Sequence, residues 1–352
     1  MPYVRWLLVA AVLSGCKKPL VGPEPEEGTG TPPALLTVNS PTKDEDPSLL
    51  LGQDGRVYAA WFSDRTGNAE IYIASTADGA TWTVPAPIVT SQWADFYPNL
   101  FQDSQGVLHV VWFQWVNLFE GQIRHSSSTD GVAWSPEEVV TREFLTDDWV
   151  PTISQAPNGS LVVYFVAARR VPLSTDNQIY VAVKRVGQPA WDTPVSLSVN
   201  SPTEHDHLPF VARTGPNQLT LVWVRYAGGA DFITNSRSDL YTATSADGLA
   251  WSPAALVTTE RKGQNLFPQL YRRHGGDWYL LWLSTRSGQP RQYELPASSL
   301  GTSLSGLTEN TLLPAGYSHR ITATARPGEY LAAWVQGTGD ALDIYYRLIT
   351  RP

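Results

Sequence analysis

Residues 57–62 read VYAAWF, and a similar short apolar run recurs five more times in the 352-residue chain. The other copies are LHVVWF at 108–113, LVVYFV at 161–166, LTLVWV at 219–224, WYLLWL at 278–283 and YLAAWV at 330–335. The aromatic residues that mark the repeat are Trp61, Trp112, Tyr164, Trp223, Trp282 and Trp334, at steps of 51, 52, 59, 59 and 52 residues. Nearly continuous apolar runs of this length are typical of strands covered on both faces.

Each apolar run is the second strand, B, of a four-stranded unit. Gly, Asn or Asp residues precede it and predict a tight hairpin from strand A. Five of the six A strands begin with proline, which is tolerated at the first residue of a strand; these are Pro47, Pro98, Pro151, Pro209 and Pro268. Strands C and D follow strand B. A repeat of roughly 50 residues built from short strands predicts a β-propeller.

The sixth unit ends after its strand C, and residues 34–38 (ALLTV) can supply the missing outer strand. We therefore predict an all-β fold over residues 34–352, a six-bladed β-propeller of four-stranded antiparallel blades. The N-terminal strand completes the last blade, which joins the two ends of the ring and removes a free sheet edge.

The N-terminal segment predicts export and lipidation. Arg5 precedes an apolar run at 6–13 that is too short to span a bilayer, and the run ends in Leu13-Ser14-Gly15-Cys16. This sequence resembles the lipobox of bacterial lipoproteins, which implies a signal peptide at 1–15 and a lipidated Cys16. An ordinary secretory signal is the alternative. Residues 16–33 are rich in Pro, Gly and Glu and predict a flexible linker.

Charge and cysteine content restrict the partners. The formal net charge is −8 and no basic stripe is present, which argues against a nucleic-acid partner. Cys16 is the only cysteine, so the chain forms no internal disulfide. Lys17 follows it in place of the Asp that retains lipoproteins in the inner membrane. We expect a monomer, lipid-anchored in the cell envelope, at the outer membrane of a Gram-negative bacterium, with a carbohydrate or an envelope protein as partner.

A second motif lies between strands C and D. An Asp-Gly pair is followed three residues later by Trp, as in Asp78, Gly79 and Trp82, Asp130, Gly131 and Trp134, and Asp247, Gly248 and Trp251. The motif resembles the Asp-box (BNR) repeat of sialidases and sialidase-like propellers, although in the family Asp stands two residues before Gly. The resemblance implies a structural role on the face opposite the catalytic site. Structural calcium at these turns is the alternative, and no other cofactor is expected.

The links from D to A and the loops from B to C share one face of a propeller, here called the D–A/B–C face. Acidic, aromatic and basic residues recur there, and the candidate ligand or catalytic residues are Asp46, Arg65, Trp93, Asp95, Tyr97, Asp148, Trp149, Asp206, His207, Arg286, His319 and Arg320. Aromatic rings and carboxylates in such a ring suit a polar ligand such as a sugar. A solvated rim that caps the strands is the alternative. His205 and His207 flank Asp206, but a metal site is not predicted there.

The leading interpretation is a binding module for a glycan or a protein, without enzymatic activity. A sialidase would need an arginine cluster for its anionic sugar, but unit one opens with Asp46-Pro47-Ser48 and an acidic ring repels an anion. A glycoside hydrolase with two carboxylates drawn from Asp46, Asp95, Asp148 and Asp206 stays open as an alternative. A scaffold protein of the envelope is the third interpretation.

Overall fold

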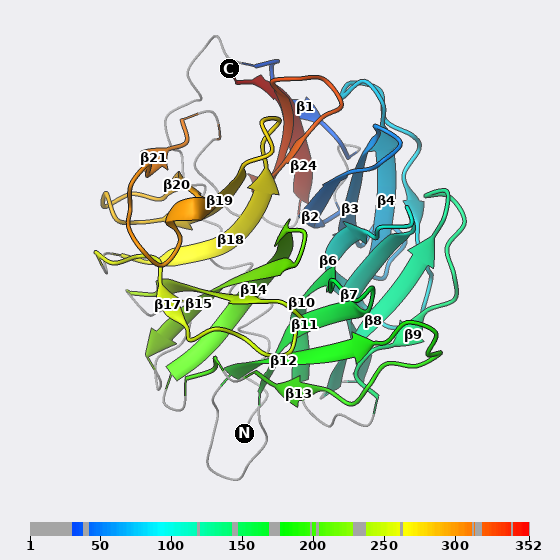
Figure 1. Cartoon of the computed structure of the whole chain (residues 1–352). Coiled ribbons are helices and arrows are strands. Elements are labelled where there is room, and N and C mark those ends of the chain that lie inside the picture. Colours follow the sequence, from blue (N-terminus) through cyan, green and yellow to red (C-terminus); the bar gives the residue numbers. More distant parts are fainter. Residues whose placement is uncertain are drawn as a thin grey trace.

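The computed structural model describes residues 30–37, 42–117, 120–142, 147–168, 177–197, 199–201, 204–227, 237–260, 263–311, 313, 319–338 and 341–351. These residues form six four-stranded antiparallel sheets arranged around a common axis (Figure 1). The prediction of a six-bladed all-β propeller is confirmed.

The first three blades run in chain order from the inner to the outer strand. Blade 1 consists of β2 (Asp44–Leu51), β3 (Val57–Ser63), β4 (Glu70–Thr76) and β5 (Ala86–Pro87). Blade 2 consists of β6 (Asp95–Gln102), β7 (Leu108–Asn117), β8 (Glu120–Ser128) and β9 (Glu138–Val139). Blade 3 consists of β10 (Asp147–Gln155), β11 (Leu161–Ala168), β12 (Asn177–Lys184) and β13 (Val195–Ser196).

The remaining blades follow the same order except for the last. Blade 4 consists of β14 (Glu204–Gly215), β15 (Gln218–Ala227), β16 (Asp239–Ser245) and β17 (Ala255–Leu256). Blade 5 consists of β18 (Asn265–Arg272), β19 (Trp278–Ser284), β20 (Arg291–Pro296) and β21 (Thr308–Glu309), with the short helix η1 (Ala297–Ser299) after β20. Blade 6 consists of β22 (Arg320–Ala323), β23 (Glu329–Thr338), β24 (Ala341–Thr350) and β1 (Ala34–Leu35).

The outer position of blade 6 is occupied by the N-terminal strand. Ala34 pairs with Tyr346 in an antiparallel register. Beyond the strand, the Thr37 hydroxyl donates a 3.0 Å hydrogen bond to Asp343, 306 positions away in sequence. The first described residues and the last strand therefore lie side by side, and the ring is completed without a covalent bond.

The core is divided into layers between neighbouring blades. The layer between blades 3 and 4 contains Tyr164, Trp223 and Trp251, and the layer between blades 6 and 1 contains Trp61 and Tyr346. Trp61, Trp112, Trp223 and Trp282 are among the largest fully buried side chains. Burial of these aromatic side chains is the main favourable contribution to the stability of the propeller.

The repeat needs one correction, in blade 3. Thr152, which follows Pro151, pairs with Tyr164, whereas Phe210, which follows Pro209, pairs with Val222, the residue before Trp223. The register equivalent of the tryptophans is therefore Phe165, and Tyr164 lies one position before it. Since successive residues of a strand face opposite ways, Tyr164 faces blade 4, where its hydroxyl donates to the Gly248 carbonyl at 2.8 Å.

The prolines of the inner strands are not strand starts, which is a second correction. In β2 the register shifts between Glu45 and Ser48, so Pro47 lies within a β-bulge, and the same irregularity recurs in β6, β10, β14 and β18. The residue before each proline has a positive φ of 48–54°, as seen for Asp46, Tyr97, Val150, Leu208 and Phe267. Left-handed backbone is strained for such side chains. In each of these five blades the bulge turns one side chain out of the strand alternation.

Candidate functional site

A pocket lies where the inner strands of the six blades meet. It is lined by Asp46, Tyr97, Pro98, Asn99, Val150, Pro151, Thr152, Leu208, Pro209, Phe210, Phe267, Pro268 and Arg320, and its free volume is about 50 Å³. All five left-handed residues are among them, so the bulges direct these side chains to the axis. A single water needs roughly 10–15 Å³ on this scale, so the axial pocket admits a few waters and not a whole sugar ring.

Three polar side chains of the axial pocket belong to the residues selected from the sequence. Burial lowers the pKa of Arg320, and the Asp46 carboxylate counteracts this shift. Burial raises the pKa of Tyr97 well above its ordinary value, and the charges of Asp46 and Glu45 add to the effect. The axis thus carries one anion, one cation and one neutral phenol in an otherwise largely apolar lining. Val150, Leu208 and Phe267 also line the pocket, and the sequence signal that identifies them is their position directly before a proline.

Asp206 lies inside the propeller, away from the axial pocket. It is fully buried and accepts a 2.8 Å hydrogen bond from the Trp223 indole and bonds of 2.6 and 2.9 Å from Arg225. Asp44 accepts in the same way from Trp61 at 2.8 Å and from Arg65 at 2.7 Å. Arg65 also lies over the ring of Tyr72, with 4.5 Å between its central carbon and the ring centroid. These acidic residues therefore connect strands A and B within their blades.

Asp95 belongs to a buried carboxyl cluster between blades 1 and 2. It is 1% exposed, and Gln114 donates to it at 2.9 Å. Burial raises the pKa of Asp95 to about 8, with a further contribution from the nearby charge of Glu70. Burial also raises the pKa of Glu70, while hydrogen bonds from Ser91, Asn68 and Asp95 oppose the shift. A carboxyl pair of this kind holds a proton at neutral pH.

Aromatic side chains gather on the D–A/B–C side of blades 2 and 3. This aromatic sector consists of Phe96, Tyr97, Phe113, Trp115 and Trp149, which pack against one core layer. Phe96 and Tyr97 lie 6.4 Å apart between ring centroids, and Phe113 and Trp115 lie 4.9 Å apart. Trp93, in the D–A link before β6, is 37% exposed. Tyr97 belongs to both the sector and the axial pocket, so the two are continuous.

The remaining candidates from the sequence are spread over other positions. His207 is buried and meets the Trp149 ring edge to face at 4.4 Å between centroids. His319 is buried, stacks on Trp334 and lies 3.0 Å from the Gln292 amide. Arg286 lies over Trp282 in blade 5. The side chain of Asp148 and the whole of Cys16 lie outside the described residues. The axial pocket therefore brings together three of the twelve candidates, Asp46, Tyr97 and Arg320.

The Asp-box turns are compact structures that pack against the neighbouring blade. Asp78 accepts from the backbone of Ala80 and Thr81 at 2.9 and 2.7 Å, and these bonds lower its pKa. Asp130 and Asp247 make the corresponding pairs of bonds, and their pKa values are lowered for the same reason. The adjacent Asp-Gly order therefore still forms the turn.

The tryptophans of these turns pack against neighbouring blades. Trp82 and Tyr346 meet edge to face with 5.4 Å between their ring centroids, and Trp251 and Tyr164 do so at 5.5 Å. Trp134 packs against the layer between blades 1 and 2.

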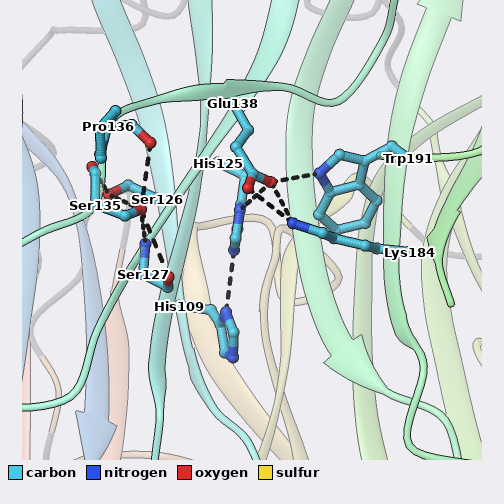
Figure 2. A network of polar contacts seen from close by, with 9 residues as sticks. All are labelled: His109, His125, Ser126, Ser127, Ser135, Pro136, Glu138, Lys184 and Trp191. Atoms are coloured by element: carbon cyan, nitrogen blue, oxygen red, sulfur yellow. Dashed lines mark hydrogen bonds and ion pairs between the residues drawn. The ribbon is translucent and has the colours of Figure 1, made fainter. Parts of the chain in front are cut away.

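A polar chain that the sequence did not single out crosses from blade 2 to blade 3 (Figure 2). His109 Nδ1 lies 3.0 Å from His125 Nε2, and His125 Nδ1 lies 3.3 Å from Glu138. Lys184 and the Trp191 indole of blade 3 also donate to Glu138, at 2.7 and 3.2 Å. Burial lowers the pKa of His109 to about 4, and the bond from His125 is the largest of the causes that lower the pKa of Glu138 to about 2. The chain connects two blades through hydrogen bonds.

Within the part of the chain that the structure describes, no three His, Cys, Asp or Glu side chains are grouped so that they could hold a metal ion. None of the described helical residues forms a helix long and apolar enough to cross a membrane.

Solved structures with the same fold include several propeller enzymes. The α-L-arabinanase of Penicillium chrysogenum superposes with a TM-score of 0.70 at 16% identity, covering 92% of this chain and 99% of that one. An α-L-arabinofuranosidase of Fusarium graminearum gives 0.70 at 15% identity, covering 92% and 98%. A Hadza microbial sialidase gives 0.60 at 12% identity, covering 87% and 65%. No protein-family model and no curated protein matches the chain. The chain thus has the sialidase-like propeller fold.

Proposed function

We propose that this protein is a bacterial surface lipoprotein that binds a glycan on its D–A/B–C face, without hydrolysing it. The observation that carries the proposal is the continuity of the aromatic sector with the axial pocket through Tyr97. The exposed ring of Trp93, in the D–A link of the same face, provides flat apolar surface for a sugar face. Asp46 and Arg320 provide an acceptor and a donor for hydroxyl groups in the axial pocket.

The position of the carboxylates supports binding over hydrolysis. Glycoside hydrolysis uses two carboxyl groups on either side of the bond that is cleaved. Among the described residues that line the axial pocket, Asp46 is the one acid. Asp95 and Asp206 are instead buried within the blades and bonded to Gln114, Trp223 and Arg225.

Binding is tested with the purified full chain on a panel of oligosaccharides, followed by calorimetric titration of any that bind. Arabino-oligosaccharides belong in the panel, because a structural neighbour was solved with arabinobiose. We expect W93A and R320M to weaken binding at least about tenfold, which corresponds to about 1.4 kcal/mol. V132A, at an exposed Asp-box position, is the matched control and should bind as wild type does. Unchanged affinity in both site variants would place the ligand elsewhere.

A glycoside hydrolase is the second candidate, because the neighbours named above are arabinan- and sialic-acid-cleaving enzymes. The raised pKa of Asp95 is also a property of catalytic acids. Turnover of aryl arabinofuranosides that is abolished in D95N and in E70Q would favour this function. Binding without turnover favours the lectin-like function, and the absence of both favours an envelope scaffold.

The membrane attachment rests on the sequence 13–16 and is tested separately. Wild-type protein expressed in a Gram-negative host should incorporate labelled palmitate and fractionate with the outer membrane, while C16S should do neither. Soluble wild-type protein without label would identify an ordinary secretory signal.

A further inference from the structure

The guanidinium group of Arg286 is buried without a hydrogen-bond partner. Its Nε, Nη1 and Nη2 atoms are shielded from solvent, and none of them has a partner among the described residues. The group lies over the rings of Trp282 and Tyr293, with its central carbon 5.7 and 5.1 Å from their centroids. Ring contacts offset only part of the hydration that a buried cation loses. Among the described residues, the Arg286 guanidinium therefore has no hydrogen-bond acceptor and no bonded carboxylate to balance its charge.

Two other blades contain the complete arrangement. In blade 1, Arg65 lies over Trp61 and Tyr72 and forms an ion pair of 2.7 Å with Asp44. In blade 4, Arg225 lies over Trp223 and Tyr241 and pairs with Asp206. In both blades, the same carboxylate also accepts the indole hydrogen bond of the tryptophan. An arginine on a Trp–Tyr pair thus faces an internal carboxylate.

Blade 5 has Asn265 at the position of that carboxylate. The amide oxygen of Asn265 accepts from the Trp282 indole at 3.1 Å, and its amide nitrogen donates to the Ser238 carbonyl at 2.7 Å. An amide nitrogen cannot accept a hydrogen bond from a guanidinium. The exchange of Asp for Asn therefore preserves the bond to tryptophan and removes the negative charge that would face Arg286.

We propose that Arg286 binds a small carboxylate-sized anion between blades 4 and 5. A guanidinium holds a carboxylate through two parallel N–H bonds, and the two rings keep its plane fixed. Because the three nitrogen atoms are shielded, the anion enters by a local displacement of the adjacent B–C loop, whose residues 287–289 are exposed. The bound anion thus provides Arg286 with the negative charge that Asp44 provides for Arg65 and Asp206 provides for Arg225.

The test is the thermal unfolding of the full chain against increasing sodium acetate, in wild type and in N265D. We expect a saturable rise in the midpoint of wild type, on the order of 2–4 °C. N265D should begin at a higher midpoint and show no saturable rise, because the new carboxylate pairs with Arg286. Chloride in place of acetate distinguishes a site for any small anion from one for carboxylates. A parallel response of wild type and N265D to acetate would overturn the proposal.

Two further variants make the result independent of N265D. R286M removes the charge at similar volume and should abolish the acetate response. D44N reproduces the blade 5 arrangement in blade 1, and we expect it to acquire an additional acetate-dependent rise. A saturable response that persists in R286M means that the anion binds elsewhere, and the proposal is then wrong.

Discussion

The indole nitrogen of Trp223 donates a 2.8 Å hydrogen bond to Asp206, which lies 17 positions earlier in the chain. The same separation joins Trp61 to Asp44 and Trp282 to Asn265. Each bond joins the first residues of strand A of a blade to the last residues of strand B. Asp44 and Asp206, each three residues before a proline, are therefore part of the blade architecture, although in the sequence they resemble an exposed rim.

Removal of the Asp206 carboxylate should destabilise the propeller strongly. D206A leaves Arg225, whose side chain is 9% exposed, without its buried partner, and we expect a loss of about 3–5 kcal/mol. The measurement is urea-induced unfolding. D192A is the matched control, because the Arg185–Asp192 pair is exposed and should contribute less than about 1 kcal/mol. Similar losses in the two variants would contradict the structural role of Asp206.

The N-terminal strand should be required for a stable ring. Deletion of residues 1–39 removes β1 and the Thr37–Asp343 bond and leaves the edge of β24 unpaired. We expect the unfolding temperature to fall by on the order of 5–10 °C. Deletion of residues 1–29 keeps β1 and serves as the control. The same unfolding temperature for both deletions would show that β1 does not stabilise blade 6.

The carboxyl cluster of blades 1 and 2 should make stability decrease as the pH rises. The pKa of Asp95 is raised from 3.8 to about 8, so the folded state keeps a proton that the unfolded state releases. This contribution is fully present below pH 4 and is lost progressively up to about pH 8. D95N should remove that slope and exceed wild type in stability at pH 8. Denaturant unfolding of both proteins at pH 5 and pH 8 gives the difference, and equal slopes would refute the shift.

His109 should act in the opposite direction. Its pKa is lowered from 6.5 to about 4, so the unfolded state takes up a proton that the folded state excludes. The resulting stability is complete above pH 6.5 and is lost as the pH falls to about 4. Nuclear magnetic resonance of the His109 ring should show a neutral side chain at pH 5, and H109Q should lack this part of the acid destabilisation. A charged His109 ring at pH 5 would contradict the expectation.

Gly131 should be required at its position for two reasons, its left-handed backbone conformation and its close approach to Tyr58. Its φ is +72°, and a Cβ atom would lie 2.6 Å from Cε1 of the buried Tyr58. G131A should cost more than the roughly 1–2 kcal/mol of left-handed strain alone. Gly67 is the matched control, because its φ is +89° and a Cβ there would meet nothing within 4 Å. Equal losses in G131A and G67A would show that the contact between blades is unimportant.

The strands and their order in each blade could be predicted from the sequence. The direction in which the side chains of the D–A links point could not. Apolar runs such as 57–62 and the Asp-Gly turns depend on local patterns, so they identify the strands and their order. Asp206 and Asp46 are chemically alike, yet Asp206, three residues before Pro209, is inside a blade, while Asp46, directly before Pro47, lies at the axis. The difference comes from the bulge at the proline, which inserts an unpaired residue and changes which side the chain faces. The two-residue alternation of a strand does not mark that change, whereas the position directly before the proline does.

The five left-handed residues give this fold a replaceable set of side chains. Asp46, Tyr97, Val150, Leu208 and Phe267 share one backbone conformation but have unrelated chemistry. The architecture therefore fixes where these groups stand and leaves their identity open. Proteins from a library that varies only these five positions should still fold, while the chemistry of the axial pocket changes. The propeller can therefore serve as a scaffold for the directed evolution of new ligand preferences.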